Sequence, residues 1–535
     1  MSRQKRTDDM GPHSRARPGS TIGSSASASP TLFDYGLAYS MKLRAHSSCI
    51  NALALSSNGG RFLASGGDDL KLHLWDFHQE DITKPNHTFI GPRSNIFCLE
   101  FSRSNQFLFA GGTDAIVHQY DVSRLESGLL SQNDKLPTSM FRENDTIRDV
   151  TCSPFHDEVF LSASDNGRIA HHDARLHHST TVRAADIIQL TAEVTSVKFH
   201  PTMEHLFVTS DSHSNVCLRD VRMAFGPLKT RSNEGIVRTF QTTIAKRNTK
   251  TMSNPEPSSL AFDQEGQKLA VTSLVSHPGS HISKYLPTSM MFLLQHYYPT
   301  IYTLSDPYPI AICTGNAVKR SPGQRTYSNS CTIKHGCFGK AGPSISDVDY
   351  YCGGSDDFCG YLWKIPPVER LIAQREEISV SEWRLDISST VGFTEKSDSP
   401  KFVPTEISTP SAILKGHNSI VNTTLIHPQF PLILTAGIES AITLHSPFPS
   451  SPFSGQLSLT PQEVRQLPST ATMEEAQVID SVLLGVDPTD GENAEQAEID
   501  TIRLFDRIIR MEGEADPFEV RPWAEDETNP DTGSS

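Results

Sequence analysis

The chain has 535 residues, of which 37% are hydrophobic and 20% are charged. This length exceeds what one ordinary core holds, so the chain contains either several domains or one repeat architecture. The net charge of −15 lies almost wholly in residues 451–535, which hold 19 acidic and 5 basic residues. The remainder is near neutral, which argues against direct nucleic-acid binding by the folded body.

No apolar run approaches the roughly 18 residues that a membrane-spanning helix needs, so we expect no membrane partner. No apolar stretch follows the basic residues near the N-terminus, and we therefore expect no secretory signal. The nine cysteines are dispersed, as in proteins that keep their thiols reduced. These features predict an intracellular protein of the nucleus, the cytoplasm or both.

Residues 1–36 are predicted to form a disordered tail, because their first 30 residues offer almost nothing to bury. A repeat begins at Leu43. Its first unit, residues 43–76, has the pattern of strand, glycine turn, strand, aspartate turn and strand. The unit recurs in residues 94–121, 149–173 and 194–220. The closing residues Asp76, Asp121, Asp173 and Asp220 lie 45, 52 and 47 positions apart, which is typical of WD repeats.

The repeat is more diverged in the second half. Residues 260–272 open a fifth unit that resumes at 300–304 after an insertion, so its completeness stays open. A sixth unit covers residues 332–363 and a seventh residues 414–446. Seven units would close a ring and remove the sheet edges. We therefore predict an all-β, seven-bladed WD-repeat β-propeller over residues 37–447. It has insertions at about 230–257 and 366–410, the second with a short helix around 368–372.

Residues 448–535 are predicted to form an acidic extension. It contains an amphipathic helix at 501–511, because Ile502, Phe505, Ile508 and Ile509 make one apolar stripe. Two interpretations of this helix remain open: it packs against the propeller, or it binds a partner.

Blade one contains the residues of an internal hydrogen-bond network. Asp69 is placed to bond His46, the His46 ring to bond Ser65, and Ser65 to bond the indole N–H of Trp75. Such a chain satisfies buried polar groups and makes the blade rigid, so its role is structural. Other blades keep parts of it: Asp114, Ser162, Thr209, Asp357 with Trp363, and His417.

The sequence lacks the common catalytic motifs. It has no Gly-rich phosphate loop ending in Gly-Lys-Ser/Thr, no His-Glu-x-x-His and no Gly-x-Ser-x-Gly. The cysteine pairs are spaced too widely for a zinc knuckle. The side chains of the adjacent histidines at 171–172 and 177–178 diverge. We expect no enzyme activity, no metal and no cofactor.

Several successive segments resemble the WD-repeat substrate receptors of cullin-4–RING ubiquitin ligases. This is the DDB1- and CUL4-associated factor family, and the likeness is greatest to its type 5 receptor, with types 6 and 8 as relatives. The segments are residues 51–76, 94–99, 329–332, 354–358, 363–366 and 414–422. The likeness covers about residues 43–447. It implies a receptor that binds the ligase adaptor, a propeller of the damaged-DNA-binding protein 1 type, and through it cullin-4. The receptor would hold an unknown protein substrate.

Receptors of this family carry Trp-Asp-x-Arg boxes, usually at the ends of two consecutive blades, whose arginines meet acidic or carbonyl groups of the adaptor. Here blade three ends in His-Asp-Ala-Arg at residues 172–175 and blade four in Arg-Asp-Val-Arg at residues 219–222. Both boxes lack the tryptophan, and we expect this loss to weaken the blade network more than the arginine contact. The resemblance implies four adaptor-binding residues: Asp173, Arg175, Asp220 and Arg222. The alternative is that both arginines are ordinary solvated residues after a strand.

The sequence thus predicts a non-catalytic scaffold that serves as a substrate-recognition subunit of a cullin-4–RING ligase. The alternative is a WD-repeat scaffold of another nuclear or cytoplasmic complex, for chromatin or RNA processing, without a ligase role.

Overall fold

The computed structural model describes residues 31–57, 59–124, 135–176, 183–247, 252–274, 297–318, 325–342, 348–385, 390–451, 455, 457–467 and 494–512. Most of them form antiparallel sheets of four or five strands. The predicted tail of residues 1–30 lies outside the described residues.

Blades one to four are regular four-stranded sheets, in which each strand pairs with the next in the chain. Blade one contains β2 (Ile50–Leu55), β3 (Phe62–Gly67), β4 (Leu72–Asp76) and β5 (His87–Phe89). Blade two contains β6 (Ile96–Phe101), β7 (Phe107–Gly112), β8 (Ile116–Asp121) and β9 (Ser139–Arg142). Blade three contains β10 (Ile147–Cys152), β11 (Val159–Ser164), β12 (Arg168–Asp173) and β13 (Ile187–Gln189). Blade four contains β14 (Val194–Phe199), β15 (Leu206–Asp211), β16 (Val216–Asp220) and β17 (Ile236–Phe240).

The other three blade sheets use strands that are farther apart in the chain. Blade five contains β20 (Glu256–Phe262), β21 (Lys268–Leu274), β22 (Thr300–Thr303), β23 (Ala311–Cys313) and β30 (Thr405–Ile407). Blade six contains β24 (Cys337–Gly339), β25 (Asp349–Gly354), β26 (Gly360–Ile365) and β31 (Ala412–Leu414). Blade seven contains β32 (Val421–Ile426), β33 (Ile433–Gly437), β34 (Ala441–Ser446), β1 (Tyr39–Arg44) and β35 (Ser458–Leu459).

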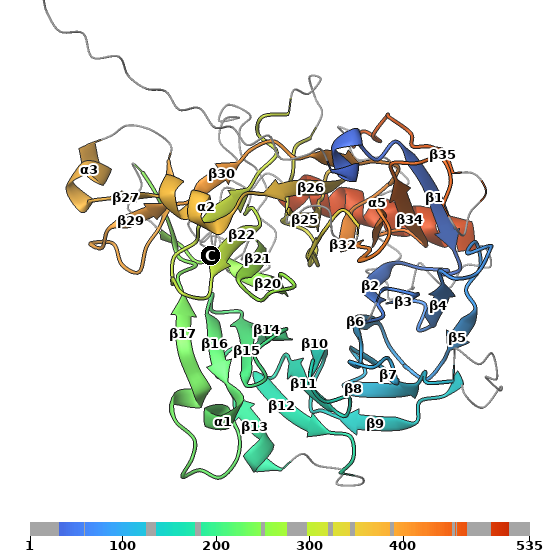
Figure 1. Cartoon of the computed structure of the whole chain (residues 1–535), viewed down its shortest axis with the longest axis horizontal. Helices are drawn as coiled ribbons and strands as arrows, with labels where there is room; N and C mark the ends of the chain where they lie inside the picture. The colour runs from blue at the N-terminus through green and yellow to red at the C-terminus, as the bar shows by residue number, and fades with distance from the viewer. Residues whose placement is uncertain are drawn as a thin grey trace, which may run out of the picture. The chain divides into compact units, whose positions relative to one another are not determined.

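The first strands of these sheets contact one another in a cycle. β2 contacts β6, and the series continues through β10, β14, β20, β24 and β32, which returns to β2. Figure 1 shows several of these strands facing the middle of the molecule. Hydrophobic clusters fill the spaces between neighbouring sheets; one joins Leu72 of blade one to Ile96 of blade two, and another joins Leu434 of blade seven to Ile50 of blade one. The core is therefore divided among the gaps between blades.

The second strand of a blade is covered on both faces, since a neighbouring sheet lies on each side. All six residues of β3 are buried, which explains the continuous apolar and small residues there. A Cβ atom on Gly67 would collide with the carbonyl oxygen of Cys49, and one on Gly112 with that of Asn95. The glycine that ends this strand therefore permits close backbone approach.

Strands from both ends of the described chain meet in blade seven. β1 pairs with β34 from Tyr39↔Ser446 to Arg44↔Ala441, and β35 pairs with the other edge of β1. Ordered structure also begins earlier than residue 37, because the 3-10 helix η1 (Leu32–Tyr35) places Phe33 in the core between blades six and seven. The predicted boundary of the N-terminal tail was therefore wrong for residues 31–36.

The two predicted insertions are more structured than expected. β17 and β20 fall within or overlap residues 230–257. The segments between the blades also supply a further sheet of order β19-β18-β28-β29-β27, here called the side sheet. Its strands are β18 (Ile244–Lys246), β19 (Met252–Ser253), β27 (Glu376–Ile378), β28 (Val391–Phe393) and β29 (Lys401–Val403). The helices of the second insertion are α2 (Val368–Gln374), where one was predicted, and α3 (Val380–Leu385).

The propeller has two distinct faces, because neighbouring first strands run in the same direction. Near the beginnings of β2 and β6, Asn51 Nδ2 donates to the carbonyl oxygen of Ile96 at 3.3 Å. Each turn between second and third strands lies at this end of its sheet. We call this the turn face; it includes Asp69, Phe358 and Glu439. Third strands end at the opposite face, which contains Arg175 and Arg222 and which we call the arginine face.

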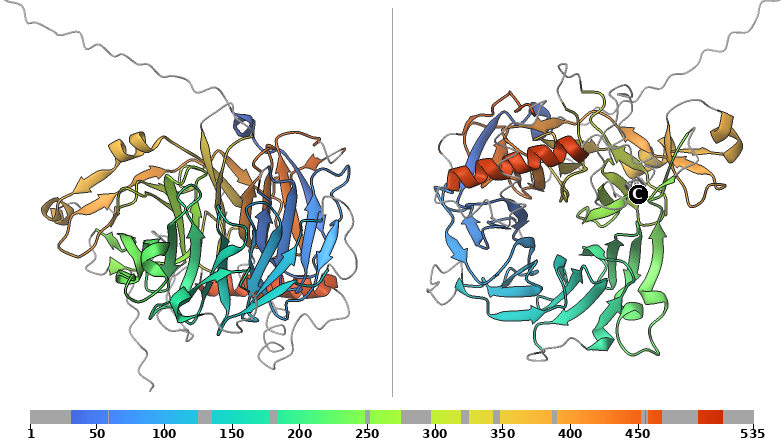
Figure 2. Two further views of the ribbon diagram at one scale, coloured as in Figure 1. Left: turned by 60° about the horizontal axis from the view of Figure 1, so that its bottom comes forward. Right: turned by 180° about the vertical axis from the view of Figure 1, so that it is seen from behind.

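The C-terminal helix α5 (Ala494–Glu512) begins seven residues before the predicted start at 501. It crosses one face of the propeller in the right-hand view of Figure 2. None of the helices in the described ranges is long and apolar enough to cross a membrane.

Candidate functional site: two Asp-x-Arg boxes on one face

The network of blade one has two of its three predicted links. His46 Nδ1 lies 3.0 Å from both carboxylate oxygens of Asp69, and His46 Nε2 lies 2.6 Å from Ser65 Oγ. Burial alone would raise the pKa of Asp69, but the hydrogen bond and charge of His46 hold it below its ordinary value. The third link is absent: Trp75 Nε1 is buried without a hydrogen-bond partner among the described residues. The indole therefore contributes by packing.

Other residues make this link where the tryptophan is replaced. Strand pairing places His172 of blade three, Arg219 of blade four and His445 of blade seven at the position of Trp75. His172 Nε2 lies 2.9 Å from Ser162 Oγ, and Arg219 Nε donates to Thr209 Oγ1 at 2.9 Å. In blades three and four, polar side chains at this position thus reach the same hydroxyl, so the loss of the tryptophan does not leave that hydroxyl without a bond.

Blade seven carries the most complete version. His417 contacts Glu439 Oε2 at 2.7 Å and Thr435 Oγ1 at 2.6 Å, and Thr435 Oγ1 also lies 2.8 Å from His445 Nε2. Glutamate thus replaces the turn aspartate, and threonine replaces serine. His417, singled out as a lone remnant, belongs to a network of four side chains.

The remaining predicted network residues have other partners. Asp114 in blade two accepts from the ring of its neighbour His118, with 2.9 Å between Oδ2 and Nε2. In blade six the Tyr361 hydroxyl donates to Asp357 Oδ2, whereas Trp363 Nε1 donates to the carbonyl oxygen of Thr314 at 2.7 Å. The Trp363 indole N–H therefore bonds a backbone carbonyl oxygen and not a side-chain hydroxyl.

The two Asp-x-Arg boxes have nearly the same geometry. Arg175 donates through Nε at 2.9 Å and Nη2 at 2.7 Å to the two oxygens of Asp173, and its backbone N–H donates to Oδ1 at 3.0 Å. Arg222 makes the same three bonds to Asp220, at 3.1, 2.7 and 2.9 Å. Each aspartate therefore holds its arginine in a fixed bidentate fork.

Both guanidinium groups remain available for a partner. The side chains of Arg175 and Arg222 are 65% and 67% exposed, against 19% and 9% for their aspartates. Hydrogen bonds from these arginines lower the pKa of Asp173 and Asp220. The arginines are neither free solvated chains nor buried ones, because the carboxylate fixes one edge of each planar group and leaves other donors outward.

Apolar side chains are exposed in the loops around the boxes. Leu176 follows the first box and is 62% exposed, Leu228 lies in the loop after the second and is 85% exposed, and Met203 in the loop before β15 is 52% exposed. All three come from loops on the arginine face of blades three and four. Exposed apolar residues beside oriented arginines are typical of protein interfaces.

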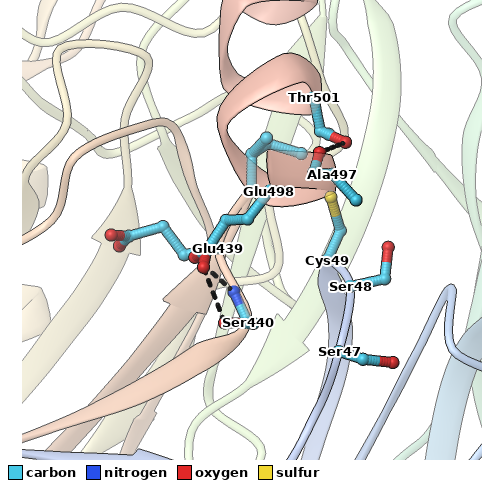
Figure 3. Close-up of a pocket in the computed structure, with 9 residues that line it drawn as sticks. Ser47, Ser48, Cys49, Glu439, Ser440, Ala497, Glu498 and Thr501 are labelled. Atoms are coloured by element: carbon cyan, nitrogen blue, oxygen red, sulfur yellow. Dashed lines mark hydrogen bonds between the residues drawn. The ribbon is translucent and has the colours of Figure 1, made fainter. Parts of the chain in front are cut away.

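On the turn face, α5 lies against blades one, six and seven. Figure 3 shows Glu498 of α5 bonded to Ser440, with Ala497 and Thr501 beside Cys49. Both Glu498 oxygens accept from Ser440, from its N–H and from its hydroxyl, each at 3.0 Å. Farther along α5, Ile509 is 2% exposed and packs in a cluster with Phe358. The first interpretation of this helix, packing against the propeller, is the one that the structure shows.

Two groups of side chains in the described ranges have the spacing of metal ligands. His46, Asp69 and His73 form the first, and the first two already bond each other in the blade network. Asp263, Glu265 and Asp349 form the second. There Lys268 Nζ lies 2.8 Å from Asp263 and 2.7 Å from Asp349, so an ammonium group occupies the cation position. All nine cysteines are free thiols.

Sequence reasoning found the boxes but missed the residues around them. The roles of His172 and Arg219 could have been found by aligning the repeats at the tryptophan position, where both carry a side-chain N–H donor. Arg231, which joins the loops that follow the two boxes, had no such signal because it lies outside the repeat pattern.

Comparison with known proteins agrees with the repeat pattern. A family model described as WD domain, G-beta repeat, matches residues 38–76 and 83–121. The chain is similar to DDB1- and CUL4-associated factor 5 of Mus musculus and of Homo sapiens. It is 26% identical to each over 422 residues, which are 78% of this chain and 35% of the relative. It is also 31% identical over 142 residues to the protein ALTERED SEED GERMINATION 2 of Arabidopsis thaliana, over 26% of this chain and 18% of that protein.

This chain therefore spans only about a third of the length of the first two relatives. The similarity nevertheless covers most of the propeller, including blades beyond those that the family model matches. Repeat motifs and strand pairing agree that the chain is an all-β propeller protein with WD repeats, and it is similar to DDB1- and CUL4-associated factor 5 over most of its length.

Proposed function

We propose that this protein is a non-catalytic substrate-recognition subunit of a cullin-4–RING ubiquitin ligase. The observation that carries the proposal is the pair of equivalent Asp-x-Arg boxes, in which Arg175 and Arg222 are held in the same fork on the same face of adjacent blades. The name of the similar proteins, which associates them with DDB1 and with CUL4, supports the same role.

In this proposal the arginine face binds the adaptor propeller. Each guanidinium group is already oriented by its aspartate, so little side-chain entropy is lost when it meets an acidic or carbonyl group. Leu176, Met203 and Leu228 supply apolar area beside the charges. The remaining surfaces would hold a protein substrate near the ligase's conjugating enzyme, and the rate gain comes from effective concentration.

The test is affinity purification of the tagged full chain with mass spectrometry. We expect the adaptor and cullin-4 to co-purify with the wild type and to be lost from the Arg175→Ala/Arg222→Ala variant, while the melting temperature stays within about 2 °C because both side chains are exposed.

A matched control removes two other exposed arginines that pair with aspartates. Arg183 and Arg384 are 67% and 69% exposed and pair with Asp186 and Asp398. The Arg183→Ala/Arg384→Ala variant has the same change in charge and should retain the adaptor. If the adaptor stays bound to the box variant, or never co-purifies with wild type, the receptor assignment is wrong, and the co-purified proteins identify the complex in which this scaffold acts.

A further inference from the structure

The loops that follow the two boxes are joined by one side chain. Arg231, in the blade-four loop between β16 and β17, donates to three carbonyl oxygens. Its Nε reaches Gly226 of its own loop at 2.9 Å. Its Nη1 and Nη2 reach Ile187 at 3.1 Å and Ala184 at 2.6 Å, both in the blade-three segment that leads into β13. One guanidinium group therefore ties blade three to blade four.

Two more contacts support the same junction. The Gly226 N–H donates to the carbonyl oxygen of Ala185 at 2.7 Å. The ring of Phe225 packs on His171, with 5.2 Å between ring centroids. His171 lies two residues before Asp173, and Phe225 caps the short helix α1 (Val221–Ala224), which contains Arg222. The junction is thus directly continuous with both boxes.

The blade-four loop is also held by contacts within its own blade. Arg219, which is 2% exposed, donates through Nη1 to the carbonyl oxygen of Glu234 at 2.8 Å. The Ser232 N–H donates to the carbonyl oxygen of Met223 at 3.1 Å. The loop that contains Arg222 is therefore held on one side by contacts within blade four and on the other by the link that Arg231 makes to blade three.

We propose that Arg231 is a positioning residue that sets the separation of the Arg175 and Arg222 guanidinium groups, so that both reach the adaptor together. This inference rests on the proposed function. Arg231 touches no partner in this scheme; it makes the two boxes one preorganised site, in which the second contact forms at high effective concentration once the first has formed.

The chemistry requires arginine. Three carbonyl oxygens in two loops match the planar fork of a guanidinium group, whereas an ammonium group on a lysine stem cannot reach them in that geometry. Arg231→Lys keeps the charge and loses the fork, and Arg231→Met keeps much of the stem and loses both. The matched control is Arg384→Ala, which removes an exposed arginine from helix α3, outside blades three and four.

The experiment combines amide hydrogen exchange on the free full chain with binding of purified adaptor. In both Arg231 variants we expect faster exchange at residues 225–226 and unchanged exchange in β2 and β3. We expect adaptor affinity to fall about tenfold or more, close to the effect of Arg175→Ala alone. Adding Arg175→Ala to the Arg231→Met variant should lower adaptor affinity by less than Arg175→Ala does in the wild type. The reason is that the Arg175 and Arg222 contacts no longer cooperate. Loss of stability alone would not remove this coupling.

The outcomes separate the two proposals. Adaptor affinity that is unchanged in the Arg231 variants, while the Arg175→Ala/Arg222→Ala variant fails to bind, overturns the positioning role and leaves the receptor function standing. Unchanged exchange at residues 225–226 overturns the junction itself, whatever the adaptor does. Full binding by the double box variant overturns the receptor function and this inference with it.

Discussion

One position in the repeat carries residues of different kinds in different blades, and in three of these blades it bonds the same hydroxyl. Trp75, His172, Arg219 and His445 occupy it, and only the last three bond the serine or threonine on the neighbouring strand. The motif residue that defines the repeat in blade one is the one that makes no hydrogen bond in the described structure. At this position an imidazole or a guanidinium group therefore extends the network, whereas the indole of blade one does not.

The buried hydrogen bond between Arg219 and Thr209 in blade four predicts a measurable loss of stability when it is removed. Thr209→Val removes the acceptor for Arg219 Nε and leaves a buried, charged donor without its partner, so the free energy of unfolding should fall by about 1–3 kcal/mol. Urea denaturation measures it. Thr443→Val is the control, since Thr443 Oγ1 is buried without a partner among the described residues. This second change should be neutral or stabilising, and equal losses in the two variants would contradict the account of the network.

At the residue scale, the sequence pattern predicted which side chains belong to the blade network. It was less successful in predicting which hydrogen bonds they make. His46, Ser65 and Asp69 are bonded as expected. The Trp75 bond was not found, because a difference of one rotamer or a fraction of an ångström decides whether an indole N–H reaches a hydroxyl. Such differences are set by packing between blades, which the sequence of one repeat does not contain.

At the scale of elements, the blades follow from local pattern and the insertions do not. Alternating strands with glycine and aspartate turns gave the repeats directly. The side sheet pairs β18 with β28, including Ala245 with Gly392. Those segments lie in separate linkers, and strands of only three residues are too short to carry a periodic signal for such a distant pairing. The helix in the acidic extension was predicted from its apolar stripe, whereas its polar anchors were not.

Those anchors predict how α5 is held. Arg465 donates to both oxygens of Asp506, at 2.8 and 2.6 Å, and the Asp506 side chain is 4% exposed. Asp506→Asn should therefore speed amide exchange along residues 494–512 while exchange in the blade strands stays the same. Asp500→Asn serves as the control, because Asp500 bonds Gln496 and Arg503 within the helix itself. Unchanged exchange in the Asp506 variant would show that apolar contacts alone hold α5.

At the scale of the whole molecule, the lowered pKa of Glu439 predicts part of the loss of stability in acid. Burial alone would raise the pKa of Glu439, but the hydrogen bond and charge of His417, with Lys42, lower it to about 2. A pKa below the unfolded value means that Glu439 stabilises the fold above about pH 4.5, and that this contribution is lost as the pH falls toward 2.

Replacing this glutamate should flatten the pH dependence. For Glu439→Gln we expect a loss of roughly 2 kcal/mol at pH 7 and a smaller slope of stability between pH 5 and pH 2, measured by urea denaturation at each pH. Glu395→Gln changes an exposed carboxylate and should leave the slope unchanged. An identical slope for Glu439→Gln and wild type would contradict the role of the His417–Glu439 pair.

Blade seven joins β1 to β34, so that Tyr39 lies opposite Ser446. During translation the partner of β1 is made some 400 residues after β1 itself. At about 5–20 residues per second, this strand waits tens of seconds with its edges unpaired. Until the last blade emerges, the propeller of the nascent chain is therefore incomplete, and β1 has unpaired edges that can pair with other chains. The demand for chaperones should be greatest in that interval, and a stop of translation before residue 441 leaves a product that cannot close.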